Sequence, residues 1–261
     1  MAFSAKSPPV TAIAQAHTDR IEVHGRDLCE DLIGSSSFTS YFLFLLTGEQ
    51  PSDMLVKVAD ATLVAIAEHG LVPSVVAARM TYAAAPDAIQ GAVSAGLLGC
   101  GTVILGASET AGRLLDDVLA RAGEGGDLEG AAREILQDMK AARQSLPGFG
   151  HPLHRNGDPR ADKLLSLAAQ WGVAGRYVAA LQAIQRSVRH VYGRDLVLNV
   201  SGAIPAVLLD AGYPLGALRG IPLLARTGSL VAHLLEEAGQ PTGFAMADAA
   251  AGAVNYRSRA V

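Results

Sequence analysis

The sequence has only two cysteines, few aromatic residues and no long apolar run. Cys29 and Cys100 have no metal-ligand spacing, so we expect free thiols in a reducing compartment. Aromatic residues make up 5% of the 261 residues, which argues against a surface that stacks single-stranded nucleic acid. No run of about 18 apolar residues predicts a membrane span, and residues 1–10 lack the apolar core of a signal peptide. We therefore expect a cytoplasmic protein with no membrane partner.

The charge balance argues against a further class of partner. The formal net charge is -4, so the chain lacks the basic character of nucleic-acid-binding domains. Hydrophobic residues make up 50% and charged residues 18%, a composition typical of a folded globular protein. At this length we expect one or two domains with a sizeable core.

The apolar spacing predicts an all-α protein with a small N-terminal β-hairpin. Residues 11–25 alternate in the manner of two short strands. Apolar residues then recur at helical spacing, and small residues suggest closely packed helices in 74–101. We expect roughly ten or more helices of about a dozen residues each, with Pro205 in the first turn of its helix. The clearest helical patterns cover 38–46, 52–69, 74–79, 89–101, 127–139, 158–171, 177–191, 202–209 and 223–233.

One polar stretch concentrates the groups that could do chemistry. Residues 151–160 contain two imidazoles, two guanidiniums and one carboxylate, and glycines and prolines precede and interrupt them. Such a run cannot be a continuous helix. It predicts a loop that enters a helix, with Asp158 as the N-cap and Pro159 as the first helical residue. The alternative is a solvated polar loop with two incidental histidines.

Two more residues are candidates outside this loop. His69 falls near a predicted helix C-terminus, where its ring could also hydrogen-bond free carbonyls. Arg226 lies among apolar residues, so it needs an anionic partner or exposure, and an ion pair within an interface is the alternative. The glycines of 91–112 are not a dinucleotide-binding motif, because no strand precedes them and their spacing is wrong.

The polar loop resembles the signature of a known superfamily. Gly148-Phe149-Gly150-His151, followed by Asp158-Pro159-Arg160, is similar to the signature of the citrate synthase superfamily. The short length and the Leu-Asn-Val sequence before Ser201 most resemble citryl-CoA lyase and the C-terminal module of ATP-citrate lyase. Four further segments resemble the superfamily in the same order: His24–Leu28, Glu68–Gly70, Leu198–Gly202 and Ala225–Thr227.

The resemblance implies a citrate-synthase-like fold with two helical domains. A large domain would comprise 1–107 and 205–261, and a small domain, 108–204, would carry the loop and close over the site. It also implies a homodimer, for which the apolar helices of 74–101 are our candidate interface. The implied partners are small molecules, an acyl-CoA and a di- or tricarboxylate, and coenzyme A enters as a thioester substrate. No permanently bound cofactor and no metal are implied.

The resemblance also carries roles to individual residues. His151 matches a histidine that donates to the substrate's carbonyl or hydroxyl oxygen and stabilises alkoxide charge. Arg160 and Arg226 match arginines that hold substrate carboxylates, a task that suits a planar bidentate donor. His69 matches a further substrate-binding histidine. We therefore expect His151, Arg160 and Arg226 to surround one small anion.

Coenzyme A contacts are implied on the same loop. Arg155 matches a basic residue that binds a coenzyme A phosphate. The backbone N–H groups of Gly148, Phe149 and Gly150 could bind the adenine side of the cofactor.

Three positions depart from the superfamily pattern. Ile104 replaces a histidine that polarises the thioester oxygen, and lyase modules lack that histidine as well. Ser201 takes the position of the catalytic aspartate, although a serine hydroxyl is no competent base without an activating partner. Gln240 replaces an arginine that reaches a neighbouring subunit. There are three other candidate bases: a water bound by Ser201, the carboxylate of Glu109, and the carboxylate of Asp195.

Three functions remain open at this point. The first is an enzyme of the citryl-CoA lyase type, which releases acetyl-CoA and oxaloacetate from citryl-CoA. The second is a citrate-synthase-like acyltransferase that joins another acyl-CoA to another 2-oxo acid. The third is a non-catalytic protein that binds coenzyme A or carboxylates, which Ile104 and Ser201 together suggest. We favour the first two functions over the third, and the lyase before the acyltransferase.

Overall fold

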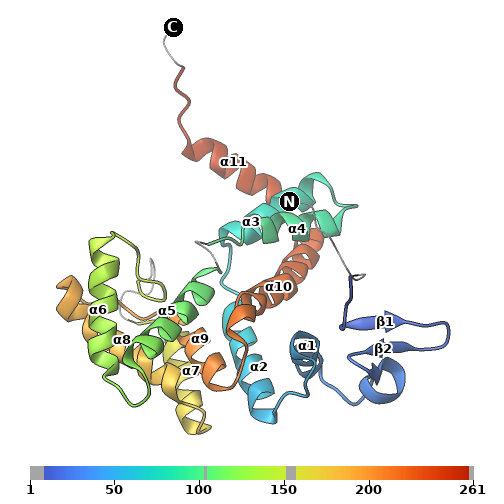
Figure 1. Cartoon of the computed structure of the whole chain (residues 1–261). Helices are drawn as coiled ribbons and strands as arrows, with labels where there is room; N and C mark the ends of the chain where they lie inside the picture. Colours follow the sequence, from blue (N-terminus) through green and yellow to red (C-terminus); the bar gives the residue numbers. More distant parts are fainter. Residues whose placement is uncertain (1–8, 103–104, 151–156, 259–261) are drawn as a thin grey trace. The chain divides into compact units, whose positions relative to one another are not determined.

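The computed structural model describes residues 9–102, 105–150 and 157–258. The chain divides into two compact units, Met1–Asp60 and Ala61–Val261. Figure 1 shows a chain built almost entirely of helices, with short strands only near the N-terminus. The prediction of an all-α fold with a small N-terminal hairpin is therefore confirmed.

The first unit contains the hairpin and one well-formed helix. Strands β1 (Ala14–Ala16) and β2 (Ile21–Val23) pair antiparallel, and a third strand, β3 (Arg26–Asp27), which the sequence did not predict, pairs with β2. A π-helical turn, η1 (Leu28–Leu32), follows. Helix α1 (Phe38–Thr47) ends at Gly48, which takes the left-handed conformation with φ 73°. Val23, Leu32 and Phe44 form the core of this unit.

Helix α2 (Asp53–Ala67) contains the boundary between the two units. The hydroxyl of Ser52 accepts a hydrogen bond from the Leu55 amide at 3.1 Å and thereby caps the start of the helix. The helix ends just before the turn that carries His69.

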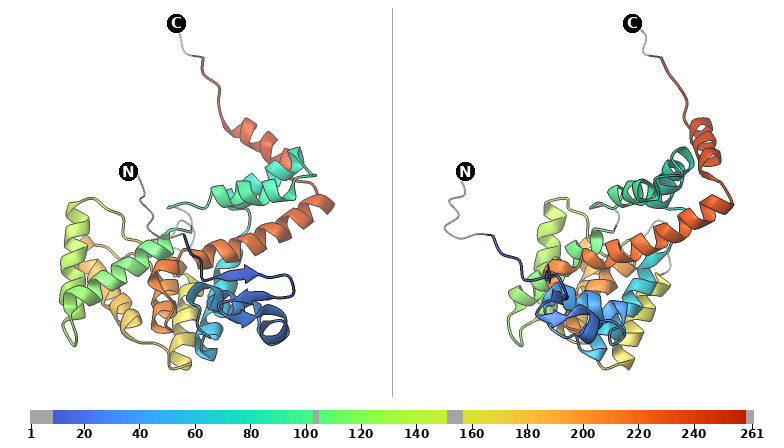
Figure 2. Two further views of the ribbon diagram at one scale, coloured as in Figure 1. Left: turned by 45° about the vertical axis from the view of Figure 1, so that its right-hand side comes forward. Right: turned by 90° about the vertical axis from the view of Figure 1, so that its right-hand side faces the viewer.

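Four helices of the second unit pack around a small apolar core. Helices α3 (Pro73–Ala84) and α4 (Ile89–Leu98) lie side by side, and both contact α10 (Gly220–Gly239), as Figure 1 and Figure 2 show. Helix α11 (Gly243–Ala253) packs against α3. A Cβ at Gly96 would meet Leu230 at 2.7 Å, so glycine permits the close approach of α4 and α10. The core consists of Val75, Ala78, Ala92, Leu230 and Leu234.

Five more helices of the second unit, α9 (Val200–Asp210) among them, pack together and appear in green to orange in Figure 2. They are α5 (Ala107–Ala122), α6 (Leu128–Ala141), α7 (Pro159–Gln170), α8 (Arg176–Tyr192) and α9 itself, and a short 3-10 turn, η2 (Leu215–Ala217), contacts α5. Helices α5, α7 and α8 all contact α9, which explains why its sequence is almost wholly apolar. The core of this group of helices includes Leu115, Leu136, Leu181, Ile184, Ile204 and Leu208.

Pro205 is deeper in its helix than the sequence indicated. We expected it in the first turn, but α9 begins at Val200 and Pro205 lies inside it. The helix starts earlier because the Asn199 side chain caps it by accepting a hydrogen bond from the Ser201 amide. Proline has no N–H, so it cannot bond the Ser201 carbonyl four residues before it.

The predicted division into a domain of 108–204 and a domain of 1–107 with 205–261 stays a prediction. Position 204 lies within α9. Among the helices of the described ranges, none combines the length and the apolar character that a membrane crossing requires.

Candidate functional site

The glycine-rich part of the polar loop pairs with the segment that enters α9. The Gly150 amide donates to the Val197 carbonyl at 2.7 Å, and the Asn199 amide donates to the Gly148 carbonyl at 2.9 Å. The Asn199 side-chain amide also donates to the Gly150 carbonyl at 2.7 Å. Gly148 has φ 81°, and a Cβ there would lie 2.6 Å from the Cα of Gly202. Glycine at 148 is therefore required both by its backbone conformation and by the approach of α9.

Asp158 joins the same segment to the start of α7. Its side chain is fully buried, and its Oδ1 accepts from the Arg160 amide at 3.1 Å and from Arg160 Nε at 3.0 Å. Its Oδ2 accepts from Arg160 Nη2 and from the Val200 amide, both at 2.9 Å. Burial by itself raises the pKa of this carboxyl, but the bonds from Arg160 and Val200 outweigh it and lower the pKa to about 2. Asp158 is thus an ionised anchor between α7 and α9, and it caps α7 as predicted.

Arg160 forms a two-bond pair with Asp158 through Nε and Nη2. Its side chain is 22% exposed, so the guanidinium remains accessible at the surface of the site. Nη1 takes no part in the pair with Asp158.

Ser201 lies in the first turn of α9, beside the glycine-rich segment. Its amide donates to Asn199 Oδ1 at 2.9 Å, and a Cβ at the next residue, Gly202, would lie 2.9 Å from the Gly148 carbonyl oxygen. The structure thus brings Gly148–Gly150, the Asp158–Arg160 pair and Ser201 together. This convergence of segments far apart in the sequence was expected only from the resemblance.

Arg226 is a buried cation on α10. It is 3% exposed, and its Nε and Nη1 atoms have no hydrogen-bond partner among the residues that the structure describes. Burial raises the pKa of the nearby Cys100 thiol, and the charge of Arg226 and the Ser74 hydroxyl only partly offset this rise. The Cys100 thiol donates to the Gly96 carbonyl at 3.4 Å. An unpaired buried guanidinium is costly, so this position calls for an anion.

His69 lies in the turn that follows α2 and is partly buried. The Glu68 carboxylate accepts from the His69 amide at 2.8 Å and from the Gly70 amide at 2.5 Å. The turn is therefore held by its own glutamate, which the sequence did not reveal as a structural partner.

The remaining predicted site residues lie outside the described residues. They are His151, Arg155 and Ile104. The convergence of His151, Arg160 and Arg226 on one anion consequently stays a prediction. Within residues 9–102, 105–150 and 157–258, no group of His, Cys, Asp and Glu side chains is arranged to hold a metal ion.

The other candidate bases are held in ion pairs. Glu109 bonds Arg113 at 3.0 Å and lies 3.2 Å from Arg219 Nε. Asp195 is 75% exposed and lies 3.5 Å from Arg189. Two guanidiniums at Glu109 and the exposure of Asp195 make both unsuitable as a base that works in a shielded site.

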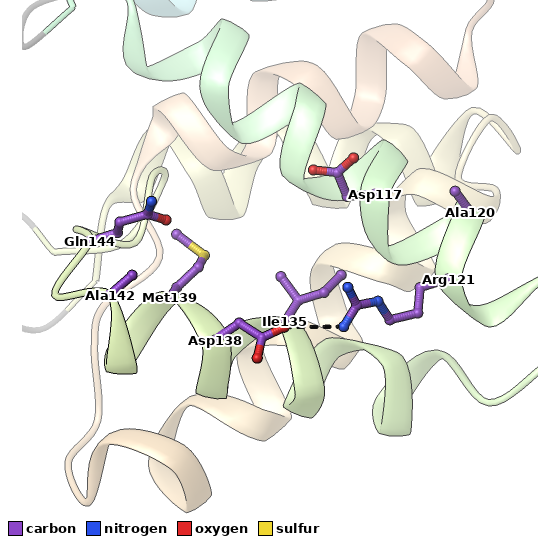
Figure 3. A pocket seen from close by; sticks show the side chains of 8 residues that line it. All are labelled: Asp117, Ala120, Arg121, Ile135, Asp138, Met139, Ala142 and Gln144. Atoms are coloured by element: carbon purple, nitrogen blue, oxygen red, sulfur yellow. Dashed lines mark hydrogen bonds and ion pairs between the residues drawn. The ribbon is translucent and has the colours of Figure 1, made fainter.

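Two adjoining cavities border α5 and α6, and the larger also borders the glycine-rich segment. The larger, of about 820 Å³, is lined by Thr102, Arg113, Gly148, Phe149 and Asn199 among others. The second, of about 660 Å³, lies between α5 and α6, where Arg121 reaches toward Asp138 (Figure 3). Four lining residues are common to both cavities: Asp117, Ile135, Met139 and Gln144. Their volumes suit a ligand of the size of a nucleotide cofactor.

Sequence reasoning missed a buried polar cluster on α3 and α10. Arg79 is 3% exposed and bonds His233, Glu236 and Glu237. The sequence did contain a sign of this cluster, because Arg79, like Arg226, is a charged residue in a predicted buried helix. The partners of Arg79 could not be identified from the sequence, since they lie more than 150 residues away.

Comparisons with solved structures find the same fold. Citryl-CoA lyase from Hydrogenobacter thermophilus superposes with a TM-score of 0.83 at 27% identity, covering 97% of this chain and 95% of that one. ATP citrate lyase from Methanothrix soehngenii, solved with citrate and coenzyme A, has a TM-score of 0.77 at 21% identity. That match covers 98% of this chain and 43% of the larger enzyme, and it concerns the fold alone.

Sequence comparisons agree. The citrate synthase of Haloferax volcanii is 28% identical over 206 residues, which cover 78% of this chain and 52% of that protein. The chain spans about half the length of the curated relatives it matches. The family model for the C-terminal domain of citrate synthase matches residues 2–243, so the chain belongs to the citrate synthase family.

Proposed function

We propose that this protein cleaves citryl-CoA into acetyl-CoA and oxaloacetate. The observation that carries the proposal is the buried guanidinium of Arg226, whose Nε and Nη1 have no partner in the described part of the chain. A cation in that state is stabilised by a bound anion, and citryl-CoA supplies carboxylates.

The structural likeness supports a lyase over a synthase, because the TM-score is 0.83 to a citryl-CoA lyase and 0.67 to a citrate synthase. The matched citryl-CoA lyase is covered over 95% of its length, whereas the Haloferax volcanii citrate synthase is covered over 52%. The absence of a histidine at Ile104 is consistent with the same choice.

The reaction requires a base, an enolate and a proton donor. A base removes the proton of the citryl hydroxyl, the carbon–carbon bond breaks, and its electron pair passes to the thioester as an enolate. The hydroxyl carbon becomes the ketone of oxaloacetate, and a proton on the enolate carbon gives acetyl-CoA. We assign the contact with the hydroxyl oxygen to His151, and we place the enolate near Ser201. There the N-terminus of α9 supplies a partial positive charge.

Asp158 does not serve as the base. Its pKa of about 2 and its four hydrogen bonds keep it ionised and occupied. Its role is to hold Arg160 and the start of α9 in register, so that Arg160 can share a substrate carboxylate with Arg226.

We place coenzyme A in the larger cavity. The cavity has a volume of about 820 Å³ and is lined by Gly148 and Phe149. The amides of Phe149 and Gly150, which we expected to bind the adenine side, donate instead to the Leu146 and Val197 carbonyls. Arg113 also lines it and is 60% exposed, so its guanidinium can bind a phosphate of the cofactor. Arg155 would provide a second phosphate contact.

Two other functions remain as outcomes of the test. Several curated relatives are named citrate synthase, and one is named 2-methylcitrate synthase, which favours an acyltransferase that uses another acyl-CoA and 2-oxo acid. A non-catalytic protein that binds coenzyme A or carboxylates is the third, because Ser201 is a poor base.

The test is a citryl-CoA cleavage assay that measures oxaloacetate and acetyl-CoA. The wild-type protein should release both in equal amounts. Arg226→Met should lower kcat/KM by about 10- to 150-fold, since it removes a hydrogen bond between charged groups. Arg133→Met, at a surface arginine paired with Glu129, is the matched control and should change kcat/KM by less than about twofold.

Unfolding of the same variants separates a functional from a structural arginine. Arg226→Met should leave the melting temperature unchanged or raise it, because it removes an unpaired buried charge. Joint loss of activity and stability in Arg226→Met would instead make Arg226 a structural residue. Release of free thiol only with other acyl-CoA and 2-oxo acid pairs would point to the acyltransferase. Binding of coenzyme A with no turnover would point to the third function.

A further inference from the structure

A buried arginine on α3 organises a polar cluster that reaches the His69 turn. Arg79 Nη1 donates to Glu237 Oε2 at 3.1 Å and to Thr242 Oγ1 at 3.3 Å. Nε and Nη2 donate to His233 Nδ1 at 3.2 and 2.8 Å, and Nη2 also bonds Glu236. The guanidinium is 3% exposed, yet each of its three nitrogens has a partner. This satisfied cation differs from Arg226 and does not call for a ligand.

The arginine determines the tautomer of His233. A guanidinium has only donors and stays protonated at all accessible pH values, so His233 Nδ1 must be the acceptor. A neutral imidazole carries its single proton on the other nitrogen. His233 Nε2 therefore carries the proton and donates it to Glu68 Oε2 at 2.9 Å.

Glu68 passes this interaction to the backbone of the turn. Its Oε2 also accepts from the Ser229 hydroxyl at 2.5 Å, and its Oε1 accepts from the amides of His69 and Gly70. Burial raises the pKa of the carboxyl, and the bonds from Ser229, Gly70 and His69 together lower it below its usual value. Although the Glu68 side chain is 51% exposed, both of its oxygens are held in place. An exposed glutamate with a fixed geometry is unusual, because long charged side chains lose entropy when they are ordered.

Glu237 closes the cluster on its other side. Its Oε1 accepts from the amides of Thr242 and Gly243 at 2.7 and 2.6 Å, and its Oε2 accepts from the Thr242 hydroxyl at 2.6 Å. The start of α11 is thereby tied to Arg79, and through Arg79 and His233 to the turn. Gly243 itself packs against α3, where a Cβ would lie 2.6 Å from that of Ala83.

We propose that His233 is a positioning residue for the substrate-binding turn at His69. Its Nε2 proton holds Glu68, and Glu68 holds both amides of the turn, while Arg79 keeps the imidazole in the required tautomer. The inference rests on the proposed function in one respect, namely that His69 contacts the acid substrate. A cavity of about 270 Å³, lined by Leu71, Arg79 and His233 among others, gives solvent access to this side of the cluster.

The first experiment observes the tautomer directly. Protein labelled with 15N at histidine is studied by NMR, in which protonated and unprotonated ring nitrogens resonate in separate ranges. His233→Gln identifies the His233 signals by their loss. We expect a proton on Nε2 and none on Nδ1 at neutral pH, and Arg79→Met should yield a mixture of tautomers. A proton on Nδ1 in the wild-type protein would overturn the inference.

The second experiment measures the turn and the substrate. In His233→Ala the amides of His69 and Gly70 should exchange with solvent faster, and KM for citryl-CoA should rise roughly tenfold with a smaller change in kcat. His233→Gln keeps a side-chain N–H near the Nε2 position and should restore most of the loss. His190→Ala, at an exposed histidine near the end of α8, is the control and should change neither quantity.

The two proposals can fail separately. If the wild-type protein does not cleave citryl-CoA, the proposed function is wrong, and the tautomer and the amide exchange still decide the role of His233. If cleavage occurs but His233→Ala leaves amide exchange and KM unchanged, the positioning role is wrong and the proposed function stands.

Discussion

Asp158 is the residue whose charge matters most to the local structure of the site. Four hydrogen bonds converge on a carboxylate with no solvent exposure, and two of them come from backbone amides, those of Arg160 and Val200. Such a group is stable only when ionised, because a proton would displace one of its donors. The start of α7 and the start of α9 thus depend on a single negative charge.

This dependence predicts a specific pH response. The pKa of Asp158 falls from 3.8 to about 2, so the folded state binds its proton more weakly than the unfolded state. The stabilisation of the folded state by this charge is complete above the pKa that Asp158 has in the unfolded chain, and it is lost as pH falls toward 2. Since one pKa unit corresponds to about 1.4 kcal/mol, the stabilisation amounts to about 2 kcal/mol. Asp158→Asn should lower the free energy of unfolding by about this amount at pH 7, and the difference should shrink below pH 4.

Urea unfolding at several pH values measures this effect. Asp162→Asn, at an exposed aspartate on the same helix, is the control and should change stability by less than about 0.5 kcal/mol. An equal loss for Asp158→Asn at pH 7 and pH 3 would show that the charge is not the cause.

Among the elements, the contact between the glycine-rich segment and α9 is the tightest of the site. Gly148 and Gly202 meet so closely that a Cβ at either position would lie within 3 Å of the other's backbone. Small residues at a crossing of this kind set the position of the helix start, and hence of Ser201. The contact between Gly148 and the start of α9 therefore determines where the Ser201 side chain lies.

Two alanine substitutions distinguish the cost of a left-handed backbone conformation from the cost of a collision between the new Cβ and α9. Gly148→Ala introduces both a left-handed non-glycine residue and a collision with Gly202, so we expect a loss of about 2 kcal/mol or more. Gly150→Ala has a similar φ, 85° against 81°, but its Cβ meets no atom within 4 Å in the part of the chain described. It should lose only about 1 kcal/mol.

Thermal unfolding compares the two variants, and binding of coenzyme A reports on the segment itself. Gly148→Ala should weaken binding because it displaces the wall of the larger cavity. Equal stability losses for Gly148→Ala and Gly150→Ala would mean that α9 can move aside without cost.

For the whole molecule, the apolar helices of 74–101 contribute to the core of a single chain, a role that we did not expect from the sequence. We expected them to form a dimer face because they are too apolar to be exposed. In the structure Val75, Ala78 and Ala92 are buried against α10 within one chain. The dimer stays a prediction, and the exposed apolar residues of α4 are Ile89, at 47% exposure, and Leu98, at 87%.

Light scattering after size-exclusion chromatography tests the assembly. A dimer of the 27.0 kDa chain should elute with twice that mass, and Leu98→Glu should shift it toward the monomer because a charge would be buried at the interface. Val64→Glu, at an exposed valine on α2, is the control and should leave the mass unchanged. A wild-type monomer at micromolar concentration would contradict the prediction.

The sequence by itself determined the helical class, the hairpin and many of the helix ends, but no helical pattern was recognised over α5 or α11. These features depend on local rules: apolar spacing, caps such as Asp158, and glycines such as Gly48 that end helices. The start of α9 was misjudged because the cap from Asn199 was not recognised. The motif resemblance named the family, which the comparisons show.

Only the tertiary structure decided which polar groups are paired. Arg226 and Arg79 look alike in the sequence, since both are arginines in apolar helices. The fold leaves two nitrogens of Arg226 without a partner in the described chain, while it gives Arg79 partners 154 and 158 residues away. The physical reason is that the cost of a buried charge depends on its neighbours in space, and helix packing brings those neighbours together from distant parts of the chain.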